Sequence, residues 1–362
     1  MDDYKNIPDC GWRSEIADFG GVVPSGRTSV RIRTIDAHTA GEPLRLIVEG
    51  FPKVEGQTIL EQRDFVREHY DHLRTALMLE PRGHADMYGA LLTPPQHPGS
   101  AAGVLFMHNE GFSTMCGHGV IAVTTILIER SMMDLPRHAD GSVRLTLDAP
   151  AGPIRLTARM EGSRVTSVAF RNVPSFVLHP GVQVRVGSRE VRADVAYGGA
   201  FYAIVDSESV GVPIIPSRLP DLRRIGMEIK HAVEAAVTVA HPDEPGLHGI
   251  YGTIFTGPPS SERADLRNVT IFADAEVDRS PCGSGTAAVM AVLSAMGMLT
   301  DSEQAFTHES IIGTHFTGRI VERTIVGDLE AIVPEIEGSA HITGEHTFII
   351  DDRDPLKEGF RI

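Results

Sequence analysis

The chain has 362 residues, which is enough for two domains of ordinary size or for one large domain. Its apolar content of 42% and charged content of 22% are those of a soluble globular protein. The formal net charge of −15 argues against nucleic acid or an anionic membrane as a partner, because both call for basic patches on the protein.

Residues 1–28 carry little hydrophobic pattern and are expected to form an extension, either flexible or packed as an arm on a partner subunit. The first residues, M-D-D-Y-K-N-I-P-D-C-G-W, lack the apolar core of a secretory signal peptide. The longest apolar stretch, near Gly119–Ile128, is too short to span a bilayer. Cys10, Cys116 and Cys282 are an odd and sparse set, unlike a disulfide framework. A reduced, cytoplasmic compartment is therefore expected.

The pattern up to residue 110 predicts strands interrupted by one long helix. Alternation of apolar and polar residues, typical of half-buried strands, predicts a strand at Ser29–Ile35, and further strands are expected at Leu44–Val48, Met87–Leu92 and Gly103–His108. Between them, Ile59–Leu79 has the apolar spacing of about 3.6 residues that an amphipathic helix shows.

The rest of the chain continues this mixture of strands and helices. Strands are predicted at Val143–Asp148, Ile154–Met160, Val165–Phe170, within Val182–Tyr197, after the glycine pair of G-G-A-F-Y-A-I-V (198–205), at Asn268–Phe272 and in alternating runs from Ser310 onward. Helices are predicted at Arg218–Ala240 and Thr286–Met298. The fold class is therefore α+β, rich in antiparallel strands, without the regular βαβ rhythm of a Rossmann fold.

The most informative feature is an internal echo around two of the cysteines. From Cys116 the chain reads C-G-H-G-V-I-A-V-T-T-I-L, and from Cys282 it reads C-G-S-G-T-A-A-V-M-A-V-L. The shared pattern C-G-x-G-x-x-A-V-x-x-x-L predicts two related halves. Each half is expected to place a cysteine at a glycine turn that opens a buried helix.

Several roles are open to these cysteines on the residues alone. Free cysteine often serves as a small buried apolar filler. A metal site is not expected, because the chain has neither C-x-x-C pairs nor an H-E-x-x-H motif, and nothing completes a ligand set around His118. A protease-type nucleophile formed by Cys116 and His118 would leave Cys282 unexplained.

An acid/base pair accounts for both cysteines. At a helix N-terminus, the unpaired N–H groups and the dipole stabilise a thiolate and can also bind a substrate carboxylate. Two such thiols facing one cleft could remove a proton from a carbon acid on one face and return one on the other, which inverts a stereocentre. No G-x-G-x-x-G or Walker A motif and no evident pyridoxal phosphate site is present, so the reaction is expected to need no cofactor.

At these residues the chain resembles the proline racemase family, which includes hydroxyproline 2-epimerases and trans-3-hydroxy-L-proline dehydratases. The matching stretches are I-D-A-H-T-A-G-E-P (35–43), L-E-P-R-G-H-A-D-M-Y-G-A (79–90), M-C-G-H-G (115–119), Y-G-G-A-F-Y-A-I-V (197–205) and D-R-S-P-C-G-S-G-T (278–286). The resemblance runs from about Arg31 to Phe360.

The resemblance implies a diaminopimelate epimerase-like fold. Two pseudo-symmetric lobes, each a curved, mostly antiparallel sheet around a central helix, would enclose the active site in the cleft between them. The lobe with Cys116 is expected to comprise residues 29–175 and 345–362, and the lobe with Cys282 residues 176–344. The expected ligand is a small imino acid, and the family suggests a homodimer.

Residue roles follow where the motifs match. Cys116 and Cys282 correspond to the two acid/base thiols, and Asp278 to the partner of the ring ammonium. The expected carboxylate cradle consists of Gly117, His118, Gly283 and Ser284, with Ser284 where many racemases have threonine. The residues expected to line the substrate ring are His84, Tyr88 and Phe272. On the residues alone, the alternative for Asp278 is that it caps its own turn, and the alternative for Tyr88 and Phe272 is core packing.

The reaction within the family is less sharply indicated. In the dehydratases the second cysteine is typically a threonine, so Cys282 favours racemisation or epimerisation of proline or a hydroxyproline. Tyr88, which stands in place of the phenylalanine of proline racemases, could form a hydrogen bond with a ring hydroxyl. Two other stretches are closer to the dehydratases, namely F-A-D-A-E-V-D-R-S-P and the C-terminal F-I-I-D-D-R-D-P-L-K-E-G-F. Dehydration of trans-3-hydroxy-L-proline is therefore the alternative, and a non-catalytic protein that binds an imino acid is a remote one.

Overall fold

The structure of the protein is a computed structural model that describes residues 29–300 and 304–362. The expected N-terminal extension, residues 1–28 with Cys10, lies outside the described residues. The described residues divide into two compact units: unit 1 contains residues 29–39, Pro43–Ala169 and Ser339–Ile362, and unit 2 contains Ala40–Glu42 and Phe170–Gly338. The boundaries expected at residues 175 and 344 lie a few residues further along the chain.

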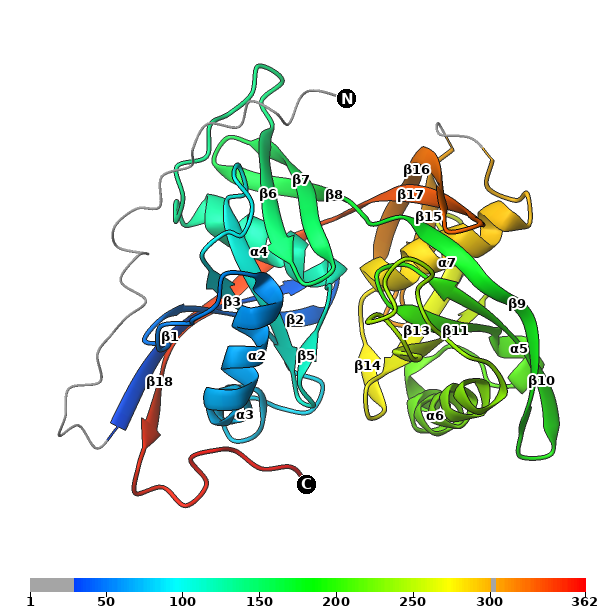
Figure 1. The fold of residues 1–362 in the computed structure, drawn as a ribbon, viewed down its shortest axis with the longest axis horizontal. Helices are drawn as coiled ribbons and strands as arrows, with labels where there is room; N and C mark the ends of the chain where they lie inside the picture. The colour runs from blue at the N-terminus through cyan, green and yellow to red at the C-terminus, as the bar shows by residue number, and fades with distance from the viewer. Residues whose placement is uncertain (1–28, 301–303) are drawn as a thin grey trace. The chain divides into compact units, whose positions relative to one another are not determined.

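From residue 29 onward, unit 1 is a mixed sheet with three helices (Figure 1). Its strands are β1 (Ser29–Thr39), β2 (Glu42–Glu49), β3 (Tyr88–Thr93), β4 (Ala102–His108), β5 (Phe112–Ser113), β6 (Val143–Ala149), β7 (Gly152–Glu161), the start of β8 (Arg164–Arg171) and β18 (Ala340–Asp351). β18 pairs antiparallel with β1, β2 pairs parallel with β3, and β3 and β4 are antiparallel. β4 pairs parallel with β6, which forms an antiparallel pair with β7.

The helices of unit 1 are α2 (Ile59–His69), α3 (Asp71–Met78) and α4 (Gly117–Glu129). The single helix expected over Ile59–Leu79 is thus two helices, separated at Tyr70, whose φ is −130°. α3 is fixed from its side by Arg74, which binds Asp71 and donates to the carbonyls of His108 and Asn109 at 2.8 and 2.7 Å. These carbonyls lie at the end of β4, so the break depends on a tertiary contact that local spacing does not reveal.

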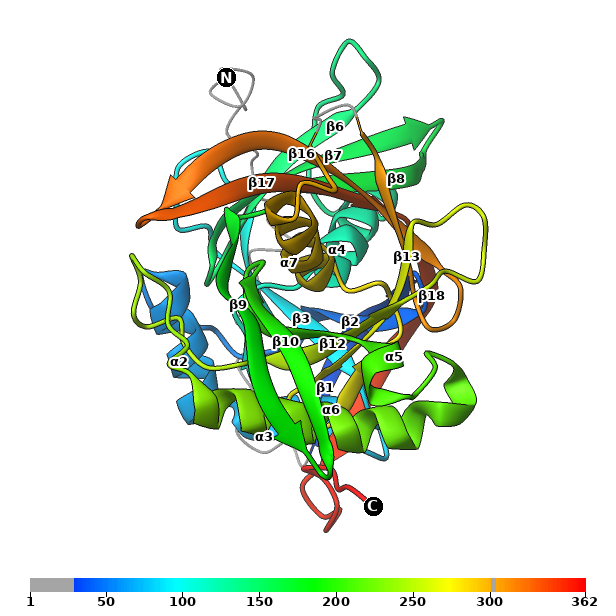
Figure 2. The ribbon, with the colours of Figure 1, turned by 90° about the vertical axis from the view of Figure 1, so that its right-hand side faces the viewer.

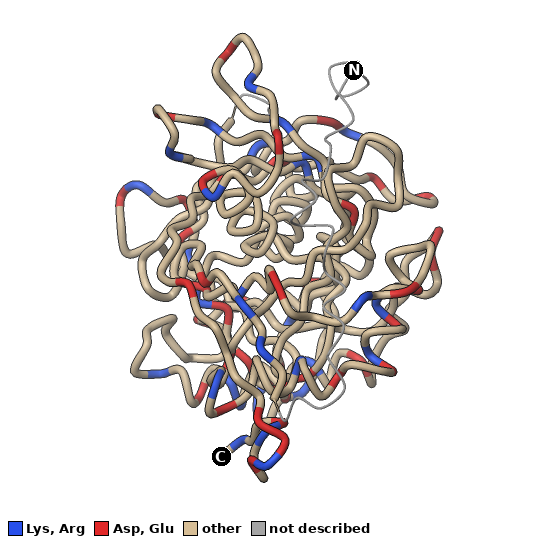
Figure 3. The backbone as a smooth tube through the Cα atoms, turned by 90° about the vertical axis from the view of Figure 1, so that its left-hand side faces the viewer, with Lys and Arg blue, Asp and Glu red and all other residues tan. Residues whose placement is uncertain are grey.

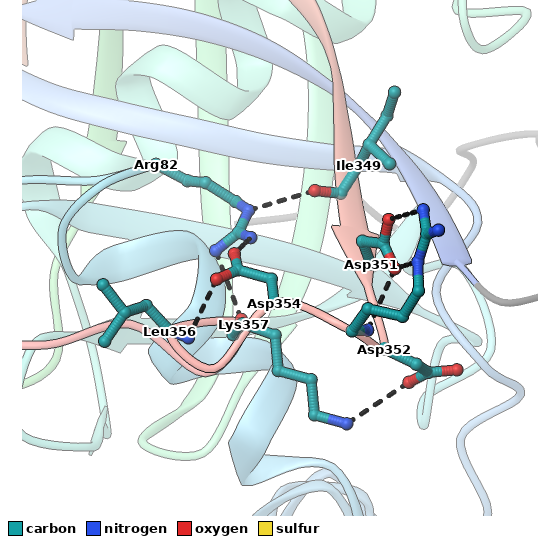
Figure 4. A network of polar contacts seen from close by, with 8 residues as sticks. Arg82, Ile349, Asp351, Asp352, Asp354, Leu356 and Lys357 are labelled. Carbon is teal, nitrogen blue, oxygen red and sulfur yellow. Dashed lines mark hydrogen bonds and ion pairs between the residues drawn. The ribbon is translucent and has the colours of Figure 1, made fainter.

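The C-terminal segment that follows β18 is held by Arg82 (Figure 4). The Arg82 guanidinium donates to the carbonyl of Lys357 at 3.2 Å and to the carboxylate of Asp354 at 3.3 Å. Further along, the N–H of Phe360 donates to the carbonyl of Glu80 at 2.9 Å. The segment is therefore tied to the loop between α3 and β3. Acidic and basic residues gather along it next to the C-terminus (Figure 3).

Unit 2 has a barrel-like sheet. Its strands are the end of β8, β9 (Ser175–Val186), β10 (Arg189–Tyr197), β11 (Phe201–Asp206), β12 (Gly252–Gly257), β13 (Leu266–Phe272), β14 (Glu276–Asp278), β15 (Phe306–Glu309), β16 (His315–Val326) and β17 (Leu329–Gly338). Pairing runs β9–β10–β11–β12–β13–β15–β16–β17 and returns from β17 to β9. The β11–β12 and β13–β15 pairs are parallel and the others antiparallel. Such closure leaves few unpaired strand edges.

The helices of unit 2 are α5 (Ser207–Val210), the short 3-10 helix η1 (Pro216–Arg218), α6 (Leu219–Ala236) and α7 (Gly283–Ala295). α7 packs against β9, β10, β11, β16 and β17. In Figure 2, β16 and β17 lie above this helix and β9 and β10 lie below it. Gly198 permits the closest approach, because a Cβ at this position would lie 2.1 Å from the carbonyl oxygen of Ser284. α6 buries one apolar face that includes Leu222, Ile229 and Val233. In the described part of the chain, no helix is both long and apolar enough to cross a membrane.

Candidate active site

Cys116 is the N-cap residue of α4. Its Sγ accepts a hydrogen bond from the N–H of Gly119 at 3.2 Å, so the sulfur satisfies one of the free amides at the helix start. A Cβ on residue 119 would lie 2.7 Å from this sulfur and 2.5 Å from Cε1 of Phe106. The second glycine of the C-G-H-G motif is therefore required by the position of the thiol itself.

Two aromatic side chains accompany Cys116 in unit 1. Nδ1 of His118 lies 3.3 Å from the Cys116 sulfur, and the His118 ring packs edge-on against Tyr88 with the ring centroids 4.7 Å apart. The Tyr88 hydroxyl in turn lies 2.5 Å from the hydroxyl of Ser113. All four residues are buried. The structure thus brings Cys116, His118 and Tyr88 together and adds Ser113, which the sequence reasoning missed.

His84 differs from this group. Its ring is exposed, and its Nδ1 lies 2.7 Å from the carbonyl of Ala85. Its own carbonyl accepts bonds from Asn109 and from the N–H of Met87, which precedes β3. Its predicted role toward a substrate ring stays a prediction.

Cys282 occupies the equivalent position at the start of α7. Its Sγ accepts the N–H of Gly285 at 3.3 Å, and a Cβ on residue 285 would lie 2.9 Å from the sulfur. Both helices have 13 residues, and each begins directly after its cysteine. The predicted placement of a cysteine at the glycine turn of a buried helix is correct in both units.

The backbone distinguishes the two cysteines. Cys116 has an extended conformation, with φ −145°, whereas Cys282 has φ +60°. This left-handed conformation costs a residue other than glycine about 1–3 kcal/mol and needs support from its surroundings. The support comes from the N–H of Cys282, which donates to Ser280, and from its carbonyl, which accepts the N–H of Thr286 at 2.7 Å.

Tyr202 is a further member of the Cys282 site. Its hydroxyl lies 2.7 Å from the hydroxyl of Ser284 and 3.8 Å from the Cys282 sulfur. Phe272 stacks on Tyr251 at 5.4 Å between centroids, and Tyr251 contacts the Tyr202 ring edge-on at 5.9 Å. Tyr202 lies in the motif Y-G-G-A-F-Y-A-I-V, but no role for it was predicted from that motif. Strand alternation offered a signal, because Phe201, Ala203 and Val205 belong to the apolar core and Tyr202 lies on the other face of β11.

Burial and nearby charge determine the protonation of this site. Burial, and after it the negative charge of Asp278, raises the pKa of Cys282 to about 12, although the N–H of Gly285 and the Tyr202 hydroxyl favour the thiolate. Burial also raises the pKa of Asp278 to about 6, against the hydrogen bonds that it accepts from Ser280 and Cys282. At neutral pH the ligand-free site therefore holds a Cys282 thiol beside a mostly ionised Asp278.

Glu42 is the other acidic residue at this turn, and sequence reasoning assigned it no role. Its side chain is 1% exposed, and its Oε2 accepts the backbone N–H of Arg279 at 2.7 Å. Among residues 29–300 and 304–362, no group of three or more His, Cys, Asp and Glu side chains is placed to hold a metal ion.

Comparison with known proteins gives one consistent result. Residues 34–361 match the family model described as proline racemase. A trans-3-hydroxy-L-proline dehydratase from Bacillus thuringiensis is 50% identical over 90% of this chain and 97% of its own length. A 3-hydroxyproline 2-epimerase from Burkholderia multivorans is 43% identical over 93% of this chain and 99% of its own. The crystal structure of a hydroxyproline epimerase from Agrobacterium vitis with bound trans-4-hydroxy-L-proline superimposes with a TM-score of 0.83 at 31% identity, covering 92% of this chain and 96% of that one.

Proposed function

Because the chain belongs to the proline racemase family, we propose that it is a cofactor-independent racemase or epimerase that inverts Cα of proline or a hydroxyproline. The observation that carries this proposal is the second thiol. Cys116 and Cys282 cap equivalent helices with the same Sγ-to-amide bond. Removal of a proton from one face needs one base, whereas delivery of a proton to the opposite face needs a second group.

In the proposed reaction, one thiolate takes the Cα proton and the thiol on the other face gives its own proton to the planar carbanion. The two sulfurs thereby exchange protonation states, and proton exchange with solvent restores the starting form before the same direction runs again. The raised pKa of Cys282 makes it the thiol of the ligand-free protein, so Cys116 is the proposed base of the first turnover. The remaining amides at the two helix starts suit a substrate carboxylate and the charge that builds on it as Cα ionises.

The other proposed roles follow the family pattern. Asp278 would pair with the ring ammonium, since a carboxylate is the natural partner of that charge. Gly117, His118, Gly283 and Ser284 would form the carboxylate cradle. His84, Tyr88 and Phe272 would contact the ring.

Dehydration of trans-3-hydroxy-L-proline is the second candidate. The dehydratase name of a relative at 50% identity favours it, and so does the buried Tyr88–Ser113 hydroxyl pair near His118, which could bond a ring hydroxyl. Here one thiolate takes the Cα proton, the C3–O bond breaks, and the same proton passes to the departing hydroxyl, which leaves as water. The resulting enamine tautomerises to Δ1-pyrroline-2-carboxylate.

A product assay in D₂O distinguishes the two. L-proline, trans-4-hydroxy-L-proline and trans-3-hydroxy-L-proline are each incubated with the protein and read by chiral separation and for the ketimine. We expect deuterium at Cα and an inverted stereocentre for at least one substrate. Formation of ketimine without any inverted product would replace the first proposal by the second. Absence of inversion, of ketimine and of deuterium exchange would refute both proposals.

Cysteine variants test the role of each sulfur in the same assay. Cys282→Ser should lose most interconversion, because serine is a far weaker acid at this position, and Cys116→Ser should do the same. Cys10→Ser, which alters the remaining cysteine of the chain, is the matched control and should retain full activity. Full interconversion by Cys282→Ser would contradict the two-thiol mechanism.

A further inference from the structure

Glu42 reaches the Cys282 site from a distant part of the sequence. The three residues Ala40–Glu42 belong to unit 2 although the residues on both sides of them belong to unit 1. They are anchored there by Thr314, whose hydroxyl donates to the carbonyl of Ala40 at 2.7 Å. At Gly41, with φ +96°, a Cβ would lie 2.3 Å from Cδ1 of Ile312. The Thr314 bond and this contact place Ala40 and Gly41 against the loop that contains Ile312, directly before Glu42.

The Glu42 carboxyl holds the turn that ends at Cys282. Its Oε2 accepts the backbone N–H of Arg279 at 2.7 Å and the Arg279 guanidinium at 3.3 Å. The next N–H, that of Ser280, and the Ser280 hydroxyl both donate to Oδ1 of Asp278, at 2.8 and 2.6 Å. Glu42 and Asp278 therefore bind successive amides of one turn, and the Ser280 hydroxyl accepts the N–H of Cys282 at 3.1 Å.

The second oxygen of Glu42, Oε1, is buried without a hydrogen-bond partner. An ionised carboxylate with an unsatisfied buried oxygen is costly, whereas a neutral carboxyl is much less so. Burial accordingly raises the pKa of Glu42 well above its ordinary range, the charge of Asp278 raises it further, and Arg279 opposes both. The loop from Ser310 to Thr314, which packs on this segment, contains no titratable side chain. Burial and the unpartnered Oε1 thus favour the neutral carboxyl of Glu42 over its carboxylate in the ligand-free protein.

We propose that Glu42 is a positioning residue of the Cys282 site, which holds the turn through Arg279 and releases one proton to solvent when an ammonium group binds beside Asp278. A cation at Asp278 offsets the negative charge that disfavours ionisation of Glu42. One positive charge enters and one proton leaves, so the net charge of the buried site is unchanged. The identity of the cation, a cyclic imino acid, rests on the proposed function.

Titration calorimetry near pH 7, in two buffers of different ionisation enthalpy, counts the protons released on binding. A Cys116→Ser background, altered in unit 1 only, keeps turnover from adding heat. The ligands are L-proline, trans-3-hydroxy-L-proline and pyrrole-2-carboxylate, a planar analogue without an ammonium group. We expect release approaching one proton for whichever imino acid binds and close to none for pyrrole-2-carboxylate.

Substitutions at Glu42 separate its two roles. Glu42→Gln keeps an oxygen that can accept the Arg279 N–H, so binding should persist while proton release disappears. Glu42→Ala should also lose proton release. When both cysteines are present, Glu42→Ala should lose more catalytic activity than Glu42→Gln. Asp148→Asn is the matched control, because Asp148 is an equally buried carboxylate that holds a loop of unit 1 through the N–H groups of Gln96 and His97.

The outcomes separate this inference from the function on which it rests. Binding with the same proton count in Glu42→Gln as in the parent overturns the role of Glu42 and leaves the proposed function standing. Failure of all three ligands to bind, together with absence of activity in the product assay, overturns both.

Discussion

The glycine three residues after each candidate catalytic cysteine controls where the thiol can lie. A methyl group on residue 285 would lie 2.9 Å from the Cys282 sulfur and 3.0 Å from Cδ1 of Ile254. Alanine is normally preferred to glycine within a helix by about 1 kcal/mol. At this position the contact with sulfur opposes that gain, and the thiol has to move.

We therefore predict that Gly285→Ala lowers kcat/KM on the order of 100-fold, because a displacement of about 1 Å is sufficient for such a loss. Thermal unfolding should change much less than activity. Gly246→Ala, at an exposed glycine with nothing within 4 Å of an added Cβ, is the control and should leave both properties unchanged. Unaltered activity of Gly285→Ala would show that the sulfur position is not critical.

His308 should make unit 2 sensitive to acid. It is fully buried, and its Nδ1 lies 2.9 Å from the Thr286 hydroxyl in α7. Burial lowers its pKa from 6.5 to about 3, so between these values the unfolded chain binds a proton that the folded protein does not. Folding stability should then decline as pH falls through this window, by up to about 1.4 kcal/mol per pH unit from this residue alone.

Urea unfolding at several pH values tests this prediction. His308→Asn should show a shallower decline between pH 6 and pH 4 than the parent, whatever its stability at neutral pH. His231→Asn, which changes an exposed histidine of α6, should retain the parent's slope. Equal slopes for all three proteins would exclude His308 as the source.

At the scale of elements, the C-terminal segment and the loop after α3 stabilise each other through Arg82. We predict that Arg82→Ala destabilises unit 1 by about 1 kcal/mol, because the partly buried carbonyl of Lys357 and carboxylate of Asp354 lose their donor. Proteolysis should then cut the segment after Asp351 first. Arg353→Ala is the control within the same segment, since the Arg353 side chain is 81% exposed and its pair with Asp351 contributes little. Equal effects of both substitutions would contradict the role given to Arg82.

The elements that the sequence predicted well are those defined by local pattern. The strand alternation and the echoed C-G-x-G turns needed only neighbouring residues, and most predicted strands lie within a few residues of the observed ones. The helix predicted from Thr286 begins at Gly283, because glycine and serine in its first turn carry no helical signal of their own.

Contacts across long separations were not predictable in this way. Glu42 meets Arg279 from 237 residues away, and Tyr202 meets Cys282 from 80. No periodicity relates such residues, and their partners become evident only when the strands that carry them are paired.

At the scale of the whole molecule, each unit is organised around one helix that has almost no exposed residue. Most of α4 and most of α7 are buried, whereas α6 keeps a polar face in solvent. Backbone amides in α4 and α7 can exchange with solvent only when the unit around them unfolds. We predict that hydrogen exchange is slowest in Val120–Leu127 and Thr286–Val292 and faster along α6. Equal protection in α6 would contradict this order.

The left-handed backbone at Cys282 bears on how one activity of this family could evolve into another. Threonine, expected at this position in the dehydratases, is β-branched and strongly disfavoured at φ +60°. A single codon change would therefore strain the turn before it altered the chemistry. Lineages that exchange the thiol for a hydroxyl should first, or simultaneously, acquire changes in residues 278–281 that allow residue 282 a negative φ. The evolutionary barrier therefore lies in the backbone conformation as much as in the loss of the sulfur.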